Sequence, residues 1–303
     1  IDFLNAVYLE INKNSSNRKY SDLITFGFWC RKSNLNNLKL NYQNKYKMFG
    51  RGNVLHITPS NASMNFAFSL AMGLLSGNSN IVRLPNRVFL QTKILCNIIK
   101  KLIKKNNFKS ISDRICIIKY KKSDEISSHL SSQVDARIIW GGDETIKQFK
   151  KYETKPRCVD LNFSNRYSIS LIKTSSKLKL QNRDIKNLAL RFYNDAYLMD
   201  QQGCSSPQAI IWLGEKENSF KNKFWNELAK IVERKYNSDL STAGKKISLI
   251  SESAILSKSK FRTNYKNFKL IRLNLNNPTN EIEKIKCQFG TFVDINLKDL
   301  KNL

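Results

Sequence analysis

Histidine is nearly absent from this 303-residue chain, which contains only His56 and His129. Its six cysteines are scattered along the sequence, and none forms a C-x-x-C pair. Because structural zinc sites are built from closely spaced cysteine and histidine ligands, we predict no metal site. The cysteine spacing also does not indicate a disulfide framework at this length.

Long apolar runs and targeting signals are also missing. No segment reaches the roughly 20 apolar residues that span a bilayer, and no signal peptide is visible, so we predict no membrane span and a cytoplasmic location. No repeat and no long Pro/Gly/Ser linker interrupts the chain. It begins at Ile1 rather than Met and ends in the lysine-rich segment 298–303, so we expect a longer natural protein.

Acidic residues are few: 24 Asp and Glu stand against 52 Lys and Arg, for a net charge of +28. A basic excess of this size usually suggests a nucleic-acid partner. Here the lysines are spread in ones and twos among abundant Asn and Ile, and no nucleic-acid-binding motif is present. We therefore predict no nucleic-acid partner, although a basic surface would attract phosphorylated cofactors and acidic carrier proteins.

Short apolar segments alternate with helical patterns through most of the chain, which predicts an α/β fold with a doubly wound parallel sheet. The expected strands are 53–57, 80–85, 114–120, 136–140, 157–161, 167–172 and 207–213. The expected helices are 1–11, 64–75, 89–105, 146–149, 183–195 and 220–236. Residues 34–46 are expected to form a polar connector. We place a nucleotide-binding domain at 1–174 and a catalytic domain at 175–303.

Cys204 follows Gly203 in a short polar turn between two segments that we expect to be packed. A cysteine thiolate is the most nucleophilic side chain near neutral pH. The glycine lets a backbone N–H point at the atom that the sulfur attacks, as thioester chemistry requires. The alternative is a small buried cysteine, which is the commoner environment of this residue type.

Three further candidates lie at the predicted carboxyl ends of strands, where parallel sheets bind ligands. Thr58–Asn61 offers hydroxyls, an amide and a helix start, Arg83 could bind a phosphate, and Gly141–Gly142 permits close backbone approach. The same residue types also cap helices, form surface ion pairs and turn chains, so both interpretations stay open. No G-x-G-x-x-G is present, so no nucleotide-binding argument rests on that motif.

Taken together, four blocks resemble a known family. They are His56–Asn61 with Asn65–Ala71, Gly73–Pro85, Ala136–Ile146 and Gln201–Cys204. Their order and spacing are similar to the aldehyde dehydrogenase superfamily. Within it they resemble the acyl-CoA (fatty acid) reductase branch, which supplies aldehyde to bacterial luciferase. The resemblance is strong over about residues 50–215 and implies a cofactor domain followed by a second α/β catalytic domain.

The resemblance implies that Cys204 is the nucleophile that forms an acyl thioester, with Asn61 and the Cys204 N–H stabilising the oxyanion. It places the cofactor against Thr58, Pro59, Ser60, Arg83, Pro85, Gly141, Gly142 and Asp143. Oxidising relatives carry a lysine where this chain has Arg83. Since an arginine suits a 2′-phosphate, NADPH is expected as the cofactor.

Two departures from the family pattern are informative. Oxidising members have an E-L-G-G-K block whose glutamate activates the hydrolytic water, whereas this chain has Asp160–Arg166 there. The loss of that glutamate fits a reductase, although Asp160 remains a candidate base. The later E-x-F-G-P block has only a faint echo in Cys287–Gly290. No histidine adjoins Cys204, so the fold, the cofactor charge or His129 must activate it.

We therefore predict NADPH-dependent reduction of a long-chain acyl-CoA or acyl-protein thioester to the aldehyde through a cysteine acyl-enzyme. Expected partners are the acyl donor and an acyl-transferase or acyl-protein synthetase, and a homo-oligomer is expected at full length. Two alternatives stay open. One is an aldehyde dehydrogenase working oxidatively with Asp160 as base. The other is a non-catalytic relative that binds acyl carriers or nucleic acid.

Overall fold

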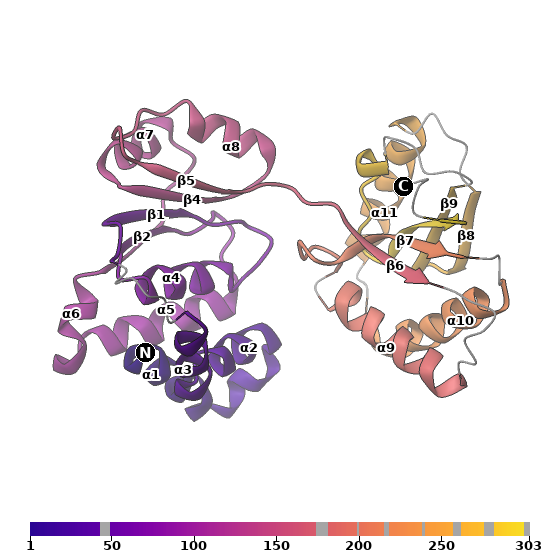
Figure 1. The fold of residues 1–303 in the computed structure, drawn as a ribbon, viewed down its shortest axis with the longest axis horizontal. Helices are drawn as coiled ribbons and strands as arrows, with labels where there is room; N and C mark the ends of the chain where they lie inside the picture. Colours follow the sequence, from indigo (N-terminus) through magenta and orange to yellow (C-terminus); the bar gives the residue numbers. More distant parts are fainter. Residues whose placement is uncertain are drawn as a thin grey trace. The chain divides into compact units, whose positions relative to one another are not determined.

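The computed structural model describes residues 1–42, 49–173, 181–198, 200–214, 218–237, 240–256, 262–275 and 282–299. The chain divides into two compact units, Ile1–Asn165 and Arg166–Leu303, shown in Figure 1. The sequence placed the division later, between 174 and 175. The difference arises because Ser168–Lys173 forms strand β6, which pairs in parallel with strand β7 (Pro207–Leu213) of the second unit.

The described part of the first unit contains a five-stranded parallel sheet in the order β3-β2-β1-β4-β5. Its strands are β1 (Asn53–Ile57), β2 (Ser79–Arg83), β3 (Ile115–Ile118), β4 (Ala136–Trp140) and β5 (Val159–Phe163). The chain moves outward from β1 to β3 and then returns to the other side of β1 at β4. This reversal makes the sheet doubly wound, which confirms the predicted fold class.

Helices cover both faces of this sheet (Figure 1). The face that carries α4 and α5 also carries the N-terminal helices: α1 (Asp2–Lys13), α2 (Ser21–Trp29), α3 (Lys32–Asn41), α4 (Asn65–Leu75) and α5 (Leu90–Ile103). The other face carries α7 (Asp124–Gln133) and α8 (Asp143–Lys150). Short helical turns complete the unit: η1 (Ser15–Lys19), η2 (Asn106–Phe108) and α6 (Lys109–Ser112).

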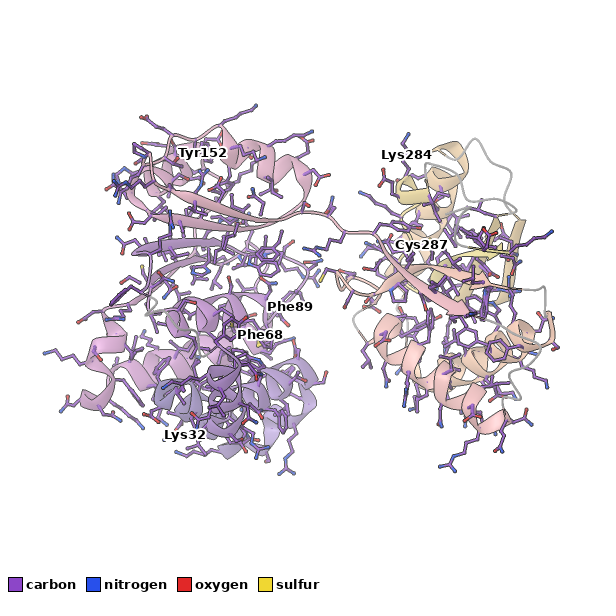
Figure 2. The ribbon with its side chains drawn as sticks, viewed as in Figure 1. Lys32, Phe68, Phe89, Tyr152, Lys284 and Cys287 are labelled. Carbon is purple, nitrogen blue, oxygen red and sulfur yellow. The ribbon has the colours of Figure 1, made fainter. Side chains whose placement is uncertain are left out.

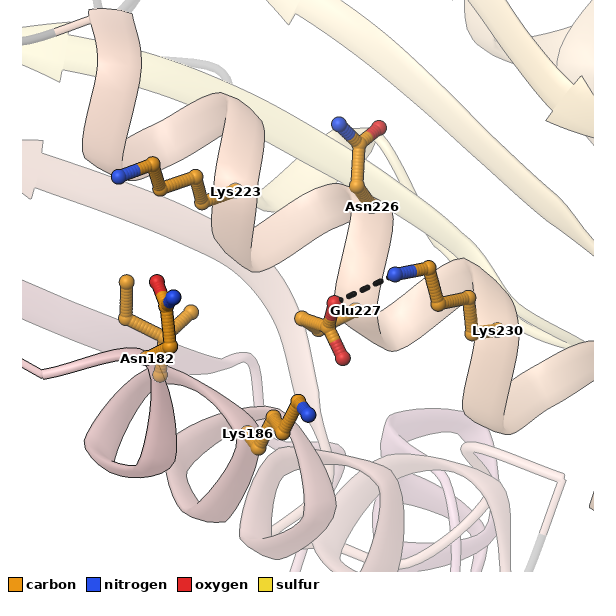
Figure 3. Close-up of a pocket in the computed structure, with 7 residues that line it drawn as sticks. Asn182, Lys186, Lys223, Asn226, Glu227 and Lys230 are labelled. Carbon is orange, nitrogen blue, oxygen red and sulfur yellow. Dashed lines mark hydrogen bonds and ion pairs between the residues drawn. The ribbon is translucent and has the colours of Figure 1, made fainter.

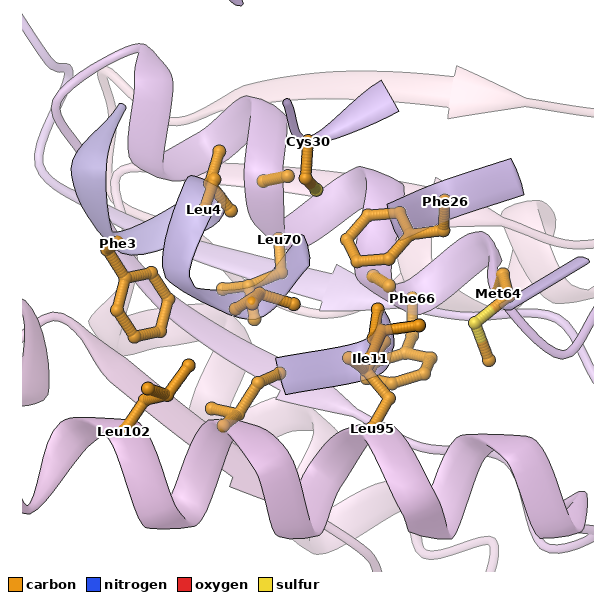
Figure 4. Packing of buried hydrophobic residues seen from close by; sticks show 14 of the residues in the cluster. Phe3, Leu4, Ile11, Phe26, Cys30, Met64, Phe66, Leu70, Leu95 and Leu102 are labelled. Carbon is orange, nitrogen blue, oxygen red and sulfur yellow. The ribbon is translucent and has the colours of Figure 1, made fainter. Parts of the chain in front are cut away.

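The main hydrophobic core of the first unit lies between α4, α5 and the N-terminal helices (Figure 4). Leu70 of α4, Leu95 of α5 and Ile11 of α1 are all nearly inaccessible to solvent. Phe68, labelled in Figure 2, packs its ring against Phe26 of α2 at a centroid distance of 5.0 Å. Each such buried side chain contributes about 1.5–3 kcal/mol, so the N-terminal helices are part of this unit's core.

The predicted polar connector at 34–46 is wrong over its first part, because Lys32–Asn41 forms α3. Leu35 is buried at 2% exposure in the core. The Asn5 side chain accepts a hydrogen bond of 3.0 Å from the Lys32 N–H at the start of the helix. Tertiary packing thus overrides the low helix propensity of asparagine. The remainder of the predicted connector, from position 43 onward, lies outside the described residues.

The second unit is built on a mostly parallel sheet in the order β6-β7-β10-β9-β8, in which only the β8–β9 pair is antiparallel among the described strands. The remaining strands are β8 (Arg262–Asn267), β9 (Leu270–Leu275) and β10 (Thr291–Leu297). The helices are α9 (Asn182–Tyr197), α10 (Asn218–Lys235), α11 (Leu240–Leu256) and the short η3 (Ile282–Lys284).

Strand β7 shows how alternate residues divide the core of the second unit. Ile210 and Trp212 face the cluster that includes α9 and α10, whereas Ala209 and Ile211 face the opposite cluster, which includes Ile250 of α11. Successive side chains of a strand point to opposite faces, so a sheet covered on both sides needs an almost continuous apolar strand. Among the described residues, no helix has the length and apolar character to cross a bilayer.

Candidate active site

Three loops of the first unit carry the predicted cofactor residues, and each follows the carboxyl end of a strand. Thr58–Asn61 follows β1, Leu84–Pro85 follows β2, and Gly141–Asp143 follows β4. Strand β1 pairs in parallel with β2 on one side and with β4 on the other. The loops therefore share one edge of the sheet, at the point where the strand order reverses. In open α/β sheets this is where a crevice forms for a ligand.

Thr58 and Arg83 are linked directly. The buried Thr58 hydroxyl donates a hydrogen bond of 2.8 Å to the Arg83 carbonyl oxygen, which ties the end of β1 to the end of β2. The guanidinium of Arg83 lies 5.0 Å from the centre of the Tyr120 ring, and its Nη2 is 3.5 Å from the Tyr120 carbonyl oxygen. Tyr120 follows β3 and was not predicted. It lies 37 residues after Arg83, so no local pattern pointed to the contact.

The loop that carries Asn61 is held by two elements. Asn61 itself is exposed, whereas Ser63 donates a hydrogen bond to the Asp22 carboxylate of α2. The Thr92 hydroxyl of α5 donates to the Ser63 carbonyl oxygen at 2.9 Å. Gln91 Nε2 donates to the same Asp22 oxygen at 3.0 Å. The conformation of this loop therefore depends on residues far away in the sequence, which the motif itself did not reveal.

The two glycines after β4 differ in how much space a side chain would have. A Cβ at Gly141 would lie 2.9 Å from the Thr145 side chain, so Gly141 is required by packing against the first turn of α8. A Cβ at Gly142 would meet Asn165 at an ordinary 3.5 Å. Asp143 is exposed in the first turn of α8, where its charge favours the helix start. The same charge would repel a pyrophosphate, so Asp143 could serve a cofactor only through its backbone.

Asp160 is not placed to act as a base. It lies in the first half of β5, away from the carboxyl edge. Both of its carboxylate oxygens accept hydrogen bonds of 2.7 Å from the buried Arg137 of β4, one from Nε and one from Nη2. A bidentate pair of this kind is among the strongest in proteins. The structure therefore opposes the prediction that Asp160 could activate a hydrolytic water.

The cysteines differ in how far they are buried. Burial raises the pKa of the Cys30 and Cys287 thiols to about 12 and that of Cys96 to about 11, so these thiols stay protonated near neutral pH. Cys116 and Cys204 are exposed. The alternative interpretation of Cys204 as a buried packing residue is therefore wrong. Because a nucleophile must be reached by its substrate, Cys204 meets the accessibility requirement of the thioester interpretation.

Cys204 lies in the second unit, in the loop that joins α9 to β7. The Ser168 hydroxyl of β6 donates to the Cys204 carbonyl oxygen at 2.6 Å, and the Ser206 N–H donates to the Gly203 carbonyl at 3.0 Å. Ser206 is buried, and its hydroxyl donates 2.8 Å to the Asp195 carbonyl of α9. The loop is thus fixed on both sides of the exposed thiol, which presents the sulfur in a defined place.

The two histidines have different environments. His56 is fully buried under α4, and burial lowers its pKa to about 4. Its Nε2 lies 3.0 Å from Asn80 Oδ1 and its Nδ1 lies 2.7 Å from the Ser69 hydroxyl. It therefore supports the sheet as a neutral, hydrogen-bonded side chain. His129 is exposed on α7 of the first unit.

A basic groove of about 270 Å³ lies between α9 and α10 (Figure 3). Its lining includes Lys186, Lys223 and Lys230, and Lys230 pairs with Glu227 at 2.7 Å. Lys186 belongs to the first turns of α9, whereas Cys204 follows the last turn. At a rise of 1.5 Å per residue the groove lies well away from the thiol, so it is not part of this site. Among the described residues, no three potential metal ligands converge.

The comparison with protein families decides the affiliation. The family model described as "Acyl-CoA reductase (LuxC)" matches residues 22–266, which is most of the chain. The chain belongs to the acyl-CoA reductase (LuxC) family. This confirms the resemblance seen in the sequence motifs.

Curated relatives of this LuxC-family chain are long-chain acyl-protein thioester reductases. The one from Aliivibrio fischeri is 25% identical over 193 residues, covering 62% of this chain and 38% of the relative. The one from Vibrio harveyi is 24% identical over 184 residues, covering 60% of this chain and 36% of the relative. The chain thus matches well under half the length of these relatives.

Solved structures similar to this LuxC-family chain are aldehyde dehydrogenases. An NAD-dependent benzaldehyde dehydrogenase from Corynebacterium glutamicum has a TM-score of 0.69 at 12% identity, covering 98% of this chain and 71% of that chain. A betaine aldehyde dehydrogenase from Staphylococcus aureus has a TM-score of 0.65 at 14% identity, covering 99% of this chain and 66% of that chain. At these identities the similarity shows the fold, which is the aldehyde-dehydrogenase fold that the motifs predicted.

Proposed function

We propose that this chain carries the acyl-transfer and cofactor-binding machinery of a long-chain acyl-thioester reductase, which converts an acyl-CoA or acyl-protein thioester to the aldehyde. The observation that carries the proposal is the exposed Cys204 on a hydrogen-bonded loop, in a chain of the LuxC family. The curated relatives are named long-chain acyl-protein thioester reductases, which supports the same substrate class.

In the proposed reaction, the Cys204 thiolate attacks the acyl carbonyl carbon and a new carbon–sulfur bond forms. The donor thiolate leaves and takes up a proton as the tetrahedral oxyanion collapses. The Cys204 N–H and the Asn61 amide would stabilise that oxyanion, because preorganised N–H donors are most effective where negative charge develops. Asn61→Ala should then slow acylation without affecting the basal reactivity of the thiol.

A nicotinamide cofactor fits the carboxyl edge of the first sheet, where Thr58 and Arg83 lie together and Gly142 has room around its α-carbon. Two of the similar structures, an indole-3-acetaldehyde dehydrogenase and the betaine aldehyde dehydrogenase, are complexes with NAD⁺, and a 3,6-anhydro-L-galactose dehydrogenase is described as a complex with NAP. When bound, the cofactor supplies the hydride that reduces the thioester. We propose NADPH as the cofactor. The guanidinium of Arg83 has five N–H donors, and the Tyr120 carbonyl oxygen binds its Nη2 only weakly, so the side chain suits a 2′-phosphate.

Other cationic residues support a phosphate near Arg83. The loop after β3 carries Lys119, Lys121 and Lys122 around Tyr120, and all three lysines are exposed. Their positive charge would lower the free energy of a 2′-phosphate at this edge, although each exposed lysine alone contributes little. The ring of Tyr120 would keep the Arg83 guanidinium in one plane for bidentate contact.

The oxidative alternative is less well supported. It needs a base that activates water, and Asp160 has both carboxylate oxygens bound by Arg137. A reductase has no use for such a base, because hydrolysis of the thioester would remove the acyl group. The proposal therefore favours reduction, with homo-oligomer formation and an acyl-transferase or acyl-protein synthetase partner as further expectations for the full-length protein.

Intact-mass spectrometry after incubation with a long-chain acyl-CoA tests the proposal. Wild type should gain the mass of one acyl group, and NADPH should remove it with release of aldehyde. Cys204→Ala should gain none, whereas Cys116→Ser, which changes the other exposed cysteine, should behave as wild type. An adduct that persists in Cys204→Ala would contradict the mechanism. Release of carboxylate in place of aldehyde would favour the oxidative alternative.

A further inference from the structure

Gln201 lies three residues before Cys204 and is buried at 3% exposure, although the loop around it is polar and largely exposed. Its backbone has φ +61°, and Asp200 before it has φ +50°. Residues with a side chain rarely adopt this left-handed conformation. Two in succession require compensating interactions, so the path of the chain into the cysteine loop is held from outside.

The side-chain amide of Gln201 makes three hydrogen bonds to backbone. Its Nε2 donates to the Pro207 carbonyl at 2.9 Å and to the Thr291 carbonyl at 2.8 Å. Its Oε1 accepts from the Gly290 N–H at 3.0 Å. Pro207 begins β7 at the far end of the cysteine loop, and Gly290 directly precedes β10. A single side chain thus connects the entrance of the loop, its exit and the turn before β10.

Backbone hydrogen bonds run beside these contacts. The Gln201 N–H donates to the Ala196 carbonyl of α9 at 2.7 Å, and the Phe289 N–H donates to the Asp200 carbonyl at 3.3 Å. Asp200 is also held by its side chain, which accepts a hydrogen bond of 2.8 Å from the hydroxyl of Tyr236, the residue directly after α10. The residues just before the cysteine turn are therefore fixed to α9, to the end of α10 and to the turn before β10.

The chemistry of the contacts selects glutamine. Two carbonyl oxygens need N–H donors and one N–H needs an acceptor, which is the inventory of a primary amide. A glutamate would turn an oxygen toward both carbonyls. The partner turn is equally constrained, because Gly290 has φ +80° and a Cβ there would lie 2.3 Å from the Lys269 carbonyl oxygen.

We propose that Gln201 is a positioning residue for Cys204: its amide fixes residues 202–206 against β7 and β10, so that the thiol meets the acyl carbonyl in one orientation. The inference rests on the proposed acyl transfer, and it adds a residue that the thioester mechanism does not itself require. A misplacement of about 1 Å at a reacting group can cost on the order of 100-fold in rate. Loss of the three Gln201 side-chain hydrogen bonds should therefore lower the rate of Cys204 acylation.

Gln208 of β7 provides a matched control. Its Oε1 accepts from the Cys287 N–H at 3.1 Å, and its Nε2 donates to the Arg166 carbonyl at 3.3 Å. Like Gln201, it is a glutamine that binds backbone in the segment before β10, where Figure 2 labels Cys287. Unlike those of Gln201, its described hydrogen bonds join Arg166 and Cys287, neither of which belongs to the cysteine loop. Gln208→Glu therefore measures the effect of losing glutamine hydrogen bonds outside that loop.

The test compares wild type, Gln201→Glu, Gln201→Met and Gln208→Glu. For each variant the rate of acylation of Cys204 by a long-chain acyl-CoA is divided by the rate of its alkylation by iodoacetamide, which needs an accessible thiolate but little orientation. We expect this ratio to fall at least tenfold in both Gln201 variants and to stay within about twofold in Gln208→Glu. An unchanged ratio in folded Gln201→Met would overturn the proposal.

Amide hydrogen exchange keeps the two proposals distinguishable. In wild type the Gly290 N–H should be protected at least tenfold relative to an exposed loop amide, and Gln201→Met should speed exchange over residues 202–206 at least tenfold. These results would stand even if wild type accepted no acyl group, in which case only the proposed function would fail. If the Gly290 amide exchanged freely in wild type, the positioning role of Gln201 would be contradicted before any variant was measured.

Discussion

Arg137 and Asp160 form a bidentate ion pair across neighbouring strands of the first sheet, with Nε and Nη2 each 2.7 Å from one carboxylate oxygen. The two residues are opposite each other in the β4–β5 register. Arg137 also donates from Nη1 to the Phe149 carbonyl at 2.9 Å, so it is held by strand and helix together. A carboxylate engaged in this way stabilises the sheet and is poorly suited to take a proton from water.

Asp160→Asn should therefore lower stability and leave acylation of Cys204 intact. The change leaves the buried Arg137 without its counter-charge. We expect a loss of about 2–3 kcal/mol in the free energy of unfolding, below the full cost for a deeply buried pair because Asp160 is 23% exposed. Urea unfolding measures it, and Glu153→Gln, an exposed carboxylate, is the control. Unchanged stability with loss of turnover would instead indicate a catalytic base.

Arg83→Ala should weaken binding of NADPH much more than binding of NADH. A charge-assisted contact to a 2′-phosphate contributes about 1.5–3 kcal/mol, which corresponds to roughly 10- to 100-fold in Kd for NADPH alone. Fluorescence titration with both cofactors gives the ratio. Arg87→Ala is a matched control, because Arg87, in the loop that follows β2, also lies over an aromatic ring, that of Phe89. Equal losses for the two cofactors would remove the argument for phosphate recognition.

Gly73→Ala should destabilise the first unit, because α4 lies very close to β2 at this position. A Cβ at Gly73 would stand 1.9 Å from Asn80 Oδ1 and 3.2 Å from His56 Cε1. We expect a loss of about 3 kcal/mol from overpacking. Gly244→Ala in α11 is a control that should change stability in the opposite direction. Its Cβ would meet nothing within 4 Å, so helix propensity should raise stability by about 0.5–1 kcal/mol.

The buried His56 predicts a pH dependence of stability. Burial lowers its pKa from 6.5 to about 4, so below pH 6.5 the unfolded chain binds a proton that the folded chain does not. The contribution of neutral His56 to the free energy of unfolding is therefore fully present above pH 6.5. It is lost as the pH falls toward 4, and the loss is about 2 kcal/mol at pH 4.5.

Urea unfolding of wild type, His56→Gln and His129→Gln between pH 4.5 and 7 tests this assignment. The pH-dependent loss should be smaller in His56→Gln than in wild type, since glutamine does not titrate. His129 is exposed, so His129→Gln should follow wild type. Parallel curves for all three proteins would show that His56 does not control this pH range.

Several elements were predicted from the sequence with their observed bounds. Strands 53–57, 136–140 and 207–213 agree residue for residue with β1, β4 and β7. Each is a short apolar run bounded by glycine, proline or polar turn residues, so local pattern and burial favour the same structure. The α4 helix ends at Leu75, the predicted last residue, and Gly77 just beyond it adopts φ +80°. The LuxC-family affiliation was also readable from the order of four motifs.

The errors and omissions share a cause. Residues 34–41 contain four asparagines and give no strong helix signal, yet Leu35 is buried against the N-terminal core and the helix forms. The boundary between units shifted because β6 pairs with β7, which lies beyond α9 in the sequence. In both cases a contact made only after folding outweighs the local preference of the segment.

The sequence by itself determined the parallel α/β architecture, the family and the choice of Cys204 and the β1, β2 and β4 loops as site candidates. Only the tertiary structure decided that the Cys204 thiol is exposed, that Asp160 is bound by Arg137, and that Gln201 joins the cysteine loop to Thr291, 90 residues later. The physical reason is the distance along the sequence over which each property is determined. Secondary structure follows the periodicity of neighbouring side chains, whereas exposure, ion pairing and hydrogen-bond partners depend on which distant segments the folded core brings together.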